Sequence, residues 1–343
     1  MLGNWISLKV KQNNSGDDQV IFKAEVIPDL YDLTVVVGDP GSGKSTLLKY
    51  LAHRLCVLEK KVLRVKLKHI SNLCQQQGKT FEDALFKAAA DSSGVNENQL
   101  KFALSCPDYL LVDGFDECDD FTNMSSQLTA WAKGHTMTKI IMTTRPGYGL
   151  EYFCDWKQVE ILPLEVSDIL AFAKKLFKIH SGDKENTKEQ EVLFENWLKN
   201  TQTDSLAAKS PQLLGFIVQL FQSDTNSILN QANIYTKIID YCIDTFPQDR
   251  EPINFDKLEA QHILTVSGRI LLKEPDISED ELLEIIVKEL TLKGYTQIEA
   301  EKLAEPGINF WENRRIFKRF KKKHQDTINF IHPTLCEYVA AKH

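Results

Sequence analysis

The stretch that decides the fold of this 343-residue chain is Gly38-Asp39-Pro40-Gly41-Ser42-Gly43-Lys44-Ser45-Thr46. It fits the pattern G-x-x-x-x-G-K-[ST], in which the backbone N–H groups of a glycine-rich loop converge on phosphate oxygens. Residues 33–37 before it predict a buried strand, and residues 45–56 after it carry helical periodicity. The loop therefore stands between a strand and a helix N-terminus, as a phosphate site requires. The alternative is a glycine-rich turn that binds nothing.

Two further stretches supply the other groups that a nucleotide site needs. We expect Lys44 to reach the β- and γ-phosphates and the Ser45 hydroxyl to ligate Mg²⁺. Residues 109–112 predict a second buried strand, and Asp113 follows at its carboxyl end, where ligands bind in open α/β sheets. We expect Asp113 to hold Mg²⁺ through a water, and Asp116 and Glu117 to orient or deprotonate the attacking water. A solvated acidic turn is the alternative.

A third buried strand, residues 139–143, leads into Thr144, Arg145 and Pro146 at the same edge of the predicted sheet. A guanidinium suits bidentate contact with phosphate, so we expect Arg145 to read the γ-phosphate. The alternative is a surface arginine that pairs with an acid such as Asp116.

The chain alternates strands and helices up to residue 164 and becomes helical after it. This order predicts a mostly parallel sheet with helices on both faces, followed by an all-α region. Residues 1–32 are strand-prone around a turn at 14–17. The other predicted strands are 61–67, 158–162 and 327–331; the predicted helices are 81–90, 166–179, 190–200, 213–222, 234–245 and 278–289, the last capped by Ser278 with Glu281; the predicted loops are 181–188 and 246–252.

Composition narrows the class of protein. Lys and Arg number 41 and Asp and Glu 48, so the formal charge is −7, which does not suit general binding to nucleic acid. No stretch reaches the ~18 apolar residues that span a bilayer. The start has no basic segment of a secretory signal. The seven cysteines are scattered without C-x-x-C spacing, which indicates reduced thiols in a cytoplasmic protein rather than a zinc site or disulfides.

These motifs together resemble the NACHT family of STAND-type P-loop NTPases, over about residues 30–343. The distinguishing mark is the small residue Gly114 after Asp113, followed by Phe115, Asp116 and Glu117. The run 143–146 looks like the family's sensor segment, which supports the γ-phosphate role of Arg145.

The resemblance implies a P-loop NTPase sheet flanked by helices, then an all-α helical domain and a winged-helix domain. The expected borders are a lead-in at 1–32 without a separate effector domain, a nucleotide-binding domain at 33–164, a helical domain at 165–224, and a helical and winged-helix domain at 225–343 that is truncated at its end.

Two more site residues come from the resemblance alone. Pro211, after Ser210, is similar to the family's proline that packs near the adenine, although a proline also initiates helices. His332 resembles the histidine that contacts the β-phosphate of bound ADP. On spacing alone, His332 before a helix reads as a packing or capping residue.

The function that the resemblance implies is a signalling switch. It binds ATP or ADP with Mg²⁺, hydrolyses ATP slowly, and self-assembles when ATP replaces ADP, with sensor and effector modules missing or separate. A role in innate-immune-type or antiphage defence follows from the resemblance only. The alternatives are a AAA-type remodelling ATPase, an ATP-regulated winged-helix transcription regulator, and a nucleotide-binding scaffold without hydrolysis.

A basic run near the end of the chain could instead form a DNA-binding stripe on a winged helix. Phe317 and Phe320 lie three apart, which indicates one buried face and a solvated basic face. With the acidic net charge, this favours the solvated reading, and we expect no direct binding to nucleic acid and no contact with membranes. The run comprises Arg314, Arg315, Lys318, Arg319, Lys321, Lys322 and Lys323.

Overall fold

The computed structural model describes residues 5–13, 19–118, 120–180, 184–200, 209–223, 231–245, 256–314, 316–322 and 325–342. The chain divides into two compact units. The first is Met1–Phe172 with Lys209–Gln212, and the second is Ala173–Ala208 with Leu213–His343. The predicted domain borders at residues 164 and 224 stay predictions. The turn expected at 14–17 and the loop expected at 246–252 lie outside the described residues.

The first unit is built on a seven-stranded sheet in the order β2-β1-β7-β3-β6-β5-β4. The five strands β3 to β7 run parallel, and β1 joins them antiparallel to β7, with β2 as its hairpin partner. The strand-prone lead-in therefore adds two strands to the same sheet. The bounds are β1 (Lys9–Asn13), β2 (Gln19–Lys23), β3 (Leu33–Val37), β4 (Val62–Lys66), β5 (Tyr109–Asp113), β6 (Lys139–Thr144) and β7 (Lys157–Ile161).

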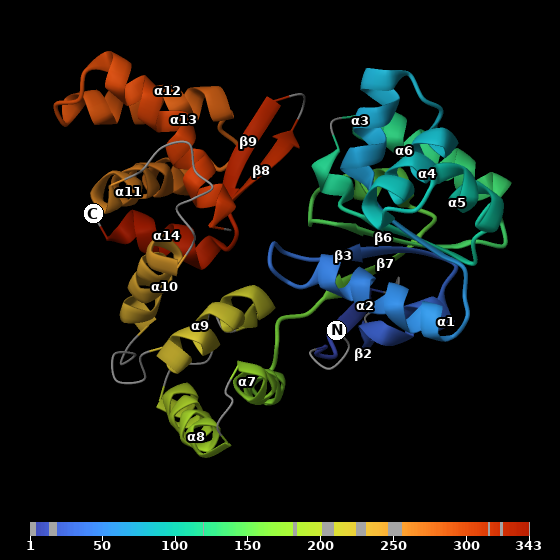
Figure 1. Ribbon diagram of the computed structural model, residues 1–343, viewed down its shortest axis with the longest axis horizontal. Coiled ribbons are helices and arrows are strands. Elements are labelled where there is room, and N and C mark those ends of the chain that lie inside the picture. Colours follow the sequence, from blue (N-terminus) through green and yellow to red (C-terminus); the bar gives the residue numbers. More distant parts are fainter. Residues whose placement is uncertain are drawn as a thin grey trace. The chain divides into compact units, whose positions relative to one another are not determined.

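Helices cover both faces of this sheet, as the strand–helix alternation predicts (Figure 1). All five residues of β5 are buried, because a central parallel strand has no face toward water. Its Leu110 and Val112 pack with α3, α4 and α6 in one core cluster. The bounds are η2 (Ala24–Val26), α1 (Ile27–Leu30), α2 (Lys44–Val57), α3 (Leu67–Gln77), α4 (Phe81–Ser93), α5 (Glu97–Ala103), η3 (Phe115–Glu117), α6 (Phe121–Gly134) and η4 (Leu150–Phe153).

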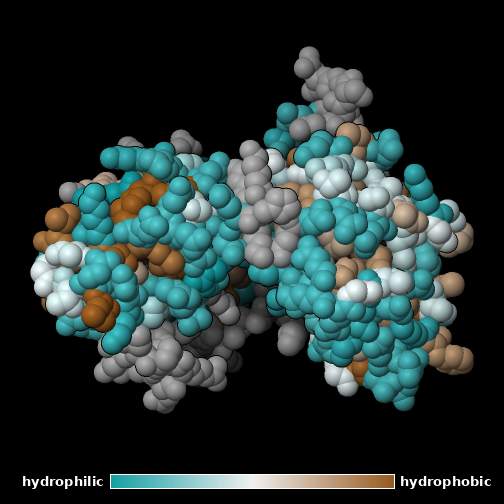
Figure 2. All heavy atoms as spheres, turned by 90° about the horizontal axis from the view of Figure 1, so that it is seen from above, coloured by the Kyte–Doolittle hydropathy of each residue, from teal (hydrophilic) through white to brown (hydrophobic). Residues whose placement is uncertain are grey.

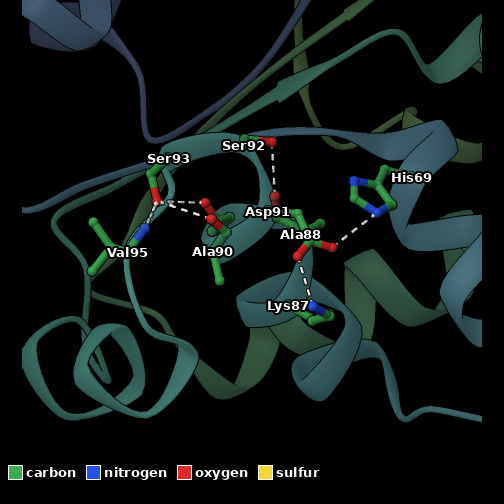
Figure 3. Close-up of polar contacts among 9 residues, drawn as sticks. His69, Lys87, Ala88, Ala90, Asp91, Ser92, Ser93 and Val95 are labelled. Carbon is green, nitrogen blue, oxygen red and sulfur yellow. Dashed lines mark hydrogen bonds and ion pairs between the residues drawn. The ribbon is translucent and has the colours of Figure 1, made fainter.

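The end of α4 is tied to α3 by polar side chains (Figure 3). Asp91 pairs with Lys87 at 2.6 Å and with His69 at 3.4 Å. The hydrogen bond from Lys87 is the main reason that the pKa of Asp91 is lowered. Ser92 donates to the Ala88 carbonyl at 2.7 Å, and Gly94 ends the helix with a positive φ of 72°. The left-handed Gly94, whose N–H donates to the Ala90 carbonyl at 2.8 Å, ends α4 before α5 begins.

In the residues that the structure describes, the second unit consists of helices and a two-stranded antiparallel sheet. Gly268 in α11 allows α14 to approach, since a Cβ there would lie 2.7 Å from a Val339 methyl group. Trp311 of α13 is fully buried and donates its indole N–H to the Ala260 carbonyl at 2.8 Å. Two helices begin in one unit and end in the other, namely α7 (Val166–His180) and α9 (Pro211–Ser223). The remaining bounds are α8 (Lys184–Asn200), α10 (Gln231–Thr245), α11 (Lys257–Lys273), α12 (Glu279–Leu292), α13 (Gln297–Asn313), β8 (Phe317–Lys322), β9 (Gln325–Phe330) and α14 (Pro333–Ala341).

Two predictions for the region after residue 164 were wrong. Residues 184–188 were expected in a loop, but α8 begins at Lys184, so only 181–183 fall outside the described residues. The basic run was expected as a solvated face. Instead Arg314 is 1% exposed and lies 3.4 Å from the centre of the Phe310 ring, and Arg319 pairs with Glu279 at 2.9 Å. The spacing of Phe317 and Phe320 was interpreted as one buried face. Residues 317–322 form a strand, in which successive side chains point to opposite faces.

The sequence predicts neither disulfides nor membrane-spanning helices. No two of the seven cysteines are joined in a disulfide, and burial raises the pKa of Cys242 to about 12. In the part of the chain that the structure describes, every helix is too short or too polar to cross a membrane.

Candidate functional site

The glycine-rich loop lies between β3 and α2, as predicted, and its backbone needs its glycines. Gly41 and Gly43 have positive φ angles of 76° and 99°. L-residues with side chains rarely adopt these angles, so the curl of the loop depends on glycine. α2 begins at Lys44, which places the partial positive charge of the helix N-terminus beside the loop. The Lys44 ammonium donates to the Asp39 carbonyl at 2.9 Å, inside the loop.

Asp113 and Ser45 meet at the carboxyl edge of the sheet, although 68 positions separate them in sequence. The Ser45 hydroxyl donates to Asp113 Oδ1 at 2.9 Å. Asp113 is the last residue of β5 and is 8% exposed. The structure therefore brings together the two residues that the sequence assigned to one metal ion.

The turn after Asp113 explains the small residue in the Asp-Gly-Phe-Asp-Glu run. Gly114 has a φ of 78°, and a Cβ there would lie 3.0 Å from Glu117 Cδ. A side chain at position 114 would strain the backbone and displace the Glu117 side chain. The turn continues as η3, in which Asp116 is 2% exposed and Glu117 is half-buried.

Arg145 pairs with Asp116, at 2.9 Å between Nε and Oδ2. This is the alternative contact raised from the sequence, but Arg145 is not a surface residue, since it is 7% exposed. Burial lowers the pKa of Arg145, and the Asp116 carboxylate opposes that shift. The structure thus holds one buried ion pair at the edge where the γ-phosphate is expected, and the γ-phosphate role of Arg145 stays a prediction.

Pro211 lies beside the loop within the first unit. Its Cγ is 3.9 Å from the position that a Gly43 Cβ would take, and Leu8 Cδ1 is 3.1 Å from the same position. The neighbouring Ser210 hydroxyl donates to the Gly41 carbonyl at 3.3 Å. An apolar pair and a hydroxyl therefore flank the two glycines with positive φ. Leu8 and Ser210 were not predicted as site residues. The only sequence signal around Leu8 is an alternating pattern that indicates a strand and no binding role.

His332 caps α14 in the second unit. Its Nδ1 accepts from the Thr334 backbone N–H at 3.3 Å and lies 2.7 Å from the Thr334 hydroxyl. The capping reading from the sequence is thus confirmed. The contact with a nucleotide phosphate stays a prediction.

The residues at the sheet edge fit Mg²⁺. A hydroxyl and a carboxylate are hard oxygen ligands, and nucleotide-bound Mg²⁺ takes only one or two carboxylates besides phosphates and waters. Among the described residues, no group of three or more His, Cys, Asp or Glu side chains could hold a metal ion by itself. The donor set therefore suits a metal that arrives with a polyphosphate.

Residues 32–180 match the family model of the NACHT domain. No protein with a curated description matches the chain by sequence. The solved structures that are distantly similar include the following three. Domain III of the Thermotoga maritima replication initiation protein DnaA is 14% identical, with 64% of this chain and 88% of that chain covered and a TM-score of 0.39. The Aeropyrum pernix ORC2 protein is 14% identical, with 93% and 92% covered and a TM-score of 0.38.

The third is a Signal Transduction ATPase with Numerous Domains (STAND) protein with a tetratricopeptide repeat sensor from Pyrococcus horikoshii. It is 13% identical, with 93% of this chain and 42% of that chain covered and a TM-score of 0.38.

Proposed function

We propose that this chain, whose residues 32–180 match the family model of the NACHT domain, is a signalling NTPase switch that binds ATP or ADP and hydrolyses ATP slowly. The observation that carries the proposal is the hydrogen bond between Ser45 and Asp113 beside the glycine-rich loop. It joins the phosphate-binding helix to the acidic strand end at one sheet edge. The preference for adenine comes from the resemblance to the family.

Each residue of the edge has a task in this proposal. The loop amides and Lys44 bind the β- and γ-phosphates, and Ser45 and Asp113 hold the metal. When bound, Mg²⁺ neutralises the charge that develops on the phosphate oxygens. Glu117, half-buried in the turn after Asp113, orients and deprotonates the attacking water. The resemblance adds Pro211 as a contact to the base and His332 as a contact to the β-phosphate of ADP.

Arg145 gives the switch a way to distinguish ATP from ADP. In this structure Asp116 neutralises its guanidinium in a buried setting. A γ-phosphate offers a second anion of the right geometry, and only ATP carries one. A ligand shifts an equilibrium only through contacts that differ between two states, and this exchange of partners is such a difference.

We further propose that the ATP-bound form self-associates. The second unit exposes large apolar side chains on α11, α12 and α13, and hydrophobic residues, coloured brown, lie on its surface at the left of Figure 2. Exposed apolar side chains are surface that self-association can cover. The exposed residues include Leu258, Leu292 and Ile298.

The test is Glu117→Gln, compared with Glu97→Gln as a matched control. Glu97 forms a surface ion pair with Lys101 at 3.1 Å, at the start of α5. We expect E117Q to lose about 10²- to 10⁴-fold in ATP hydrolysis, the range for a general base, while it binds ATP as tightly as wild type. E97Q should hydrolyse ATP normally. Phosphate release and equilibrium binding of labelled ATP measure the two quantities.

Two results would contradict this proposal. Normal hydrolysis by E117Q would remove the catalytic assignment. Fast steady-state turnover by wild-type protein without any trigger would favour a remodelling ATPase instead of a switch. Light scattering on E117Q with ATP and with ADP tests self-association, which we expect with ATP only.

A further inference from the structure

Thr143 lies near the carboxyl end of β6, beside the end of β5 that carries Asp113. It lies in β6, one residue before the end of the strand, and is 0% exposed. Val112 and Met142 are partners in the parallel register of β5 and β6, so the next residues, Asp113 and Thr143, lie side by side at the sheet edge. The hydroxyl of Thr143 thereby reaches the turn that follows β5.

This hydroxyl makes two hydrogen bonds in opposite senses. It donates to Asp113 Oδ1 at 3.0 Å and accepts from the Gly114 backbone N–H at 3.0 Å. A hydroxyl has one donor and can accept as well, so both bonds form together. Valine has the same shape as threonine and could make neither.

Hydrogen bonds from two hydroxyls hold the Asp113 carboxylate in one orientation. Its Oδ1 accepts from two hydroxyls, that of Ser45 at 2.9 Å and that of Thr143 at 3.0 Å. Two donors on one oxygen set the rotation of the carboxylate plane. The bond to Gly114 holds the start of the turn that carries Asp116 and Glu117.

We propose that Thr143 is a positioning residue that orients Asp113 for binding of Mg²⁺ together with the nucleotide. This rests on the proposed function of the site. Partners that orient a metal ligand typically change metal affinity or activity by about 10- to 100-fold when they are removed. Thr143 is two residues before Arg145, so the same strand end positions the metal ligand and carries the predicted γ-phosphate contact.

The chain offers a matched control in Thr34 of β3. Thr34 is also 0% exposed, in the same sheet, and its hydroxyl has no hydrogen-bond partner among the described residues. Thr34→Val therefore makes the same chemical change in the same kind of surroundings without touching Asp113. A loss caused by general disturbance of the sheet would occur in both valine variants.

The experiment is a Mg²⁺ titration of nucleotide binding, followed by the fluorescence of a labelled ATP analogue and started in EDTA. In T143V we expect the Mg²⁺ concentration at half-maximal effect to rise about tenfold, with affinity in EDTA unchanged. T143S keeps the hydroxyl and should stay near wild type, as should T34V. T143S and T143A form a second pair, which isolates the hydroxyl if valine prevents folding.

The outcomes separate this inference from the proposed function. A wild-type protein that binds no nucleotide would overturn both. A wild-type protein that binds, with equal Mg²⁺ midpoints in T143V and wild type, or in T143A and T143S, would overturn only the role of Thr143. Equal shifts in T143V and T34V would also overturn it.

Discussion

Single side chains at the sheet edge are held by partners far away in sequence. The Thr143 hydroxyl, the Ser45 hydroxyl and the Arg145 guanidinium each contact a carboxylate of the run 113–116. Breaking a buried ion pair by removing one partner is costly, because the other charge stays buried. The Asp116–Arg145 pair therefore persists unless another anion replaces the carboxylate.

Replacement by a γ-phosphate predicts a specific behaviour of Arg145→Ala. Hydrogen bonds to charged groups contribute about 1.5–3 kcal/mol, so we expect ATP affinity to fall about tenfold or more while ADP affinity changes little. Competition binding with the two nucleotides measures the ratio. Arg54→Ala is the control, since Arg54 pairs with Asp29 at 3.4 Å at a partly exposed position. An equal loss of ATP and ADP affinity in R145A would show that Arg145 pairs with Asp116 but does not contact the γ-phosphate.

Elements of the first unit support the site through close packing. The loop between β6 and β7 packs on the turn after β5, where Phe115 is fully buried between Phe121 and Phe153. Gly149 in this loop has a φ of 66°, and a Cβ there would lie 2.1 Å from Phe115 Cε1. Phe115 directly precedes Asp116, so this packing holds the start of the turn that carries the acidic residues.

Gly149→Ala should therefore destabilise the fold more than Gly147→Ala. Gly147 has a similar φ of 78°, but nothing lies within 4 Å of its added Cβ. Both variants strain the backbone, and only G149A adds overpacking, which typically costs about 1–3 kcal/mol. Urea unfolding measures the difference in the free energy of unfolding. Equal values for the two variants would contradict this packing.

The elements also show how far sequence patterns reach. The five parallel strands were predicted within about one or two residues, because buried β-branched runs bounded by loops are a strong signal. α3 was missed, since it follows β4 without a break and Lys66 at its N-cap gives no capping hydrogen bond. α6 was also missed, because the acidic residues before it were interpreted as part of a turn. One of them, Asp120, is the N-cap of this helix. α11 and α13 were also missed, although each begins with a capping box.

The site was predictable only as far as local motifs extend. The loop, Asp113 and the order of strand and acid are contiguous in sequence, so their residues could be named. The contacts of Thr143, Leu8 and Ser210 join segments 29 or more positions apart. No periodicity encodes such pairs. The register of β5 and β6 decides the contact of Thr143 with Asp113, and the packing of loops decides the contacts of Leu8 and Ser210.

The function proposed for the chain as a whole depends on one site, where loop amides and the Lys44 ammonium bind a nucleotide polyphosphate. A nucleotide that binds only the folded chain raises the free energy of unfolding, by about 2.7 kcal/mol at a nucleotide concentration one hundred times Kd. Nucleotide uptake is therefore visible both as binding and as a rise in Tm.

The decisive measurement is isothermal titration of purified protein with ADP and ATP in magnesium buffer, for wild type and Lys44→Ala. We predict one nucleotide per chain for wild type and a loss of affinity of about tenfold or more in K44A, since a charge-assisted contact to phosphate is removed. No uptake of either nucleotide by folded wild-type protein, or equal uptake by K44A, would contradict the claim.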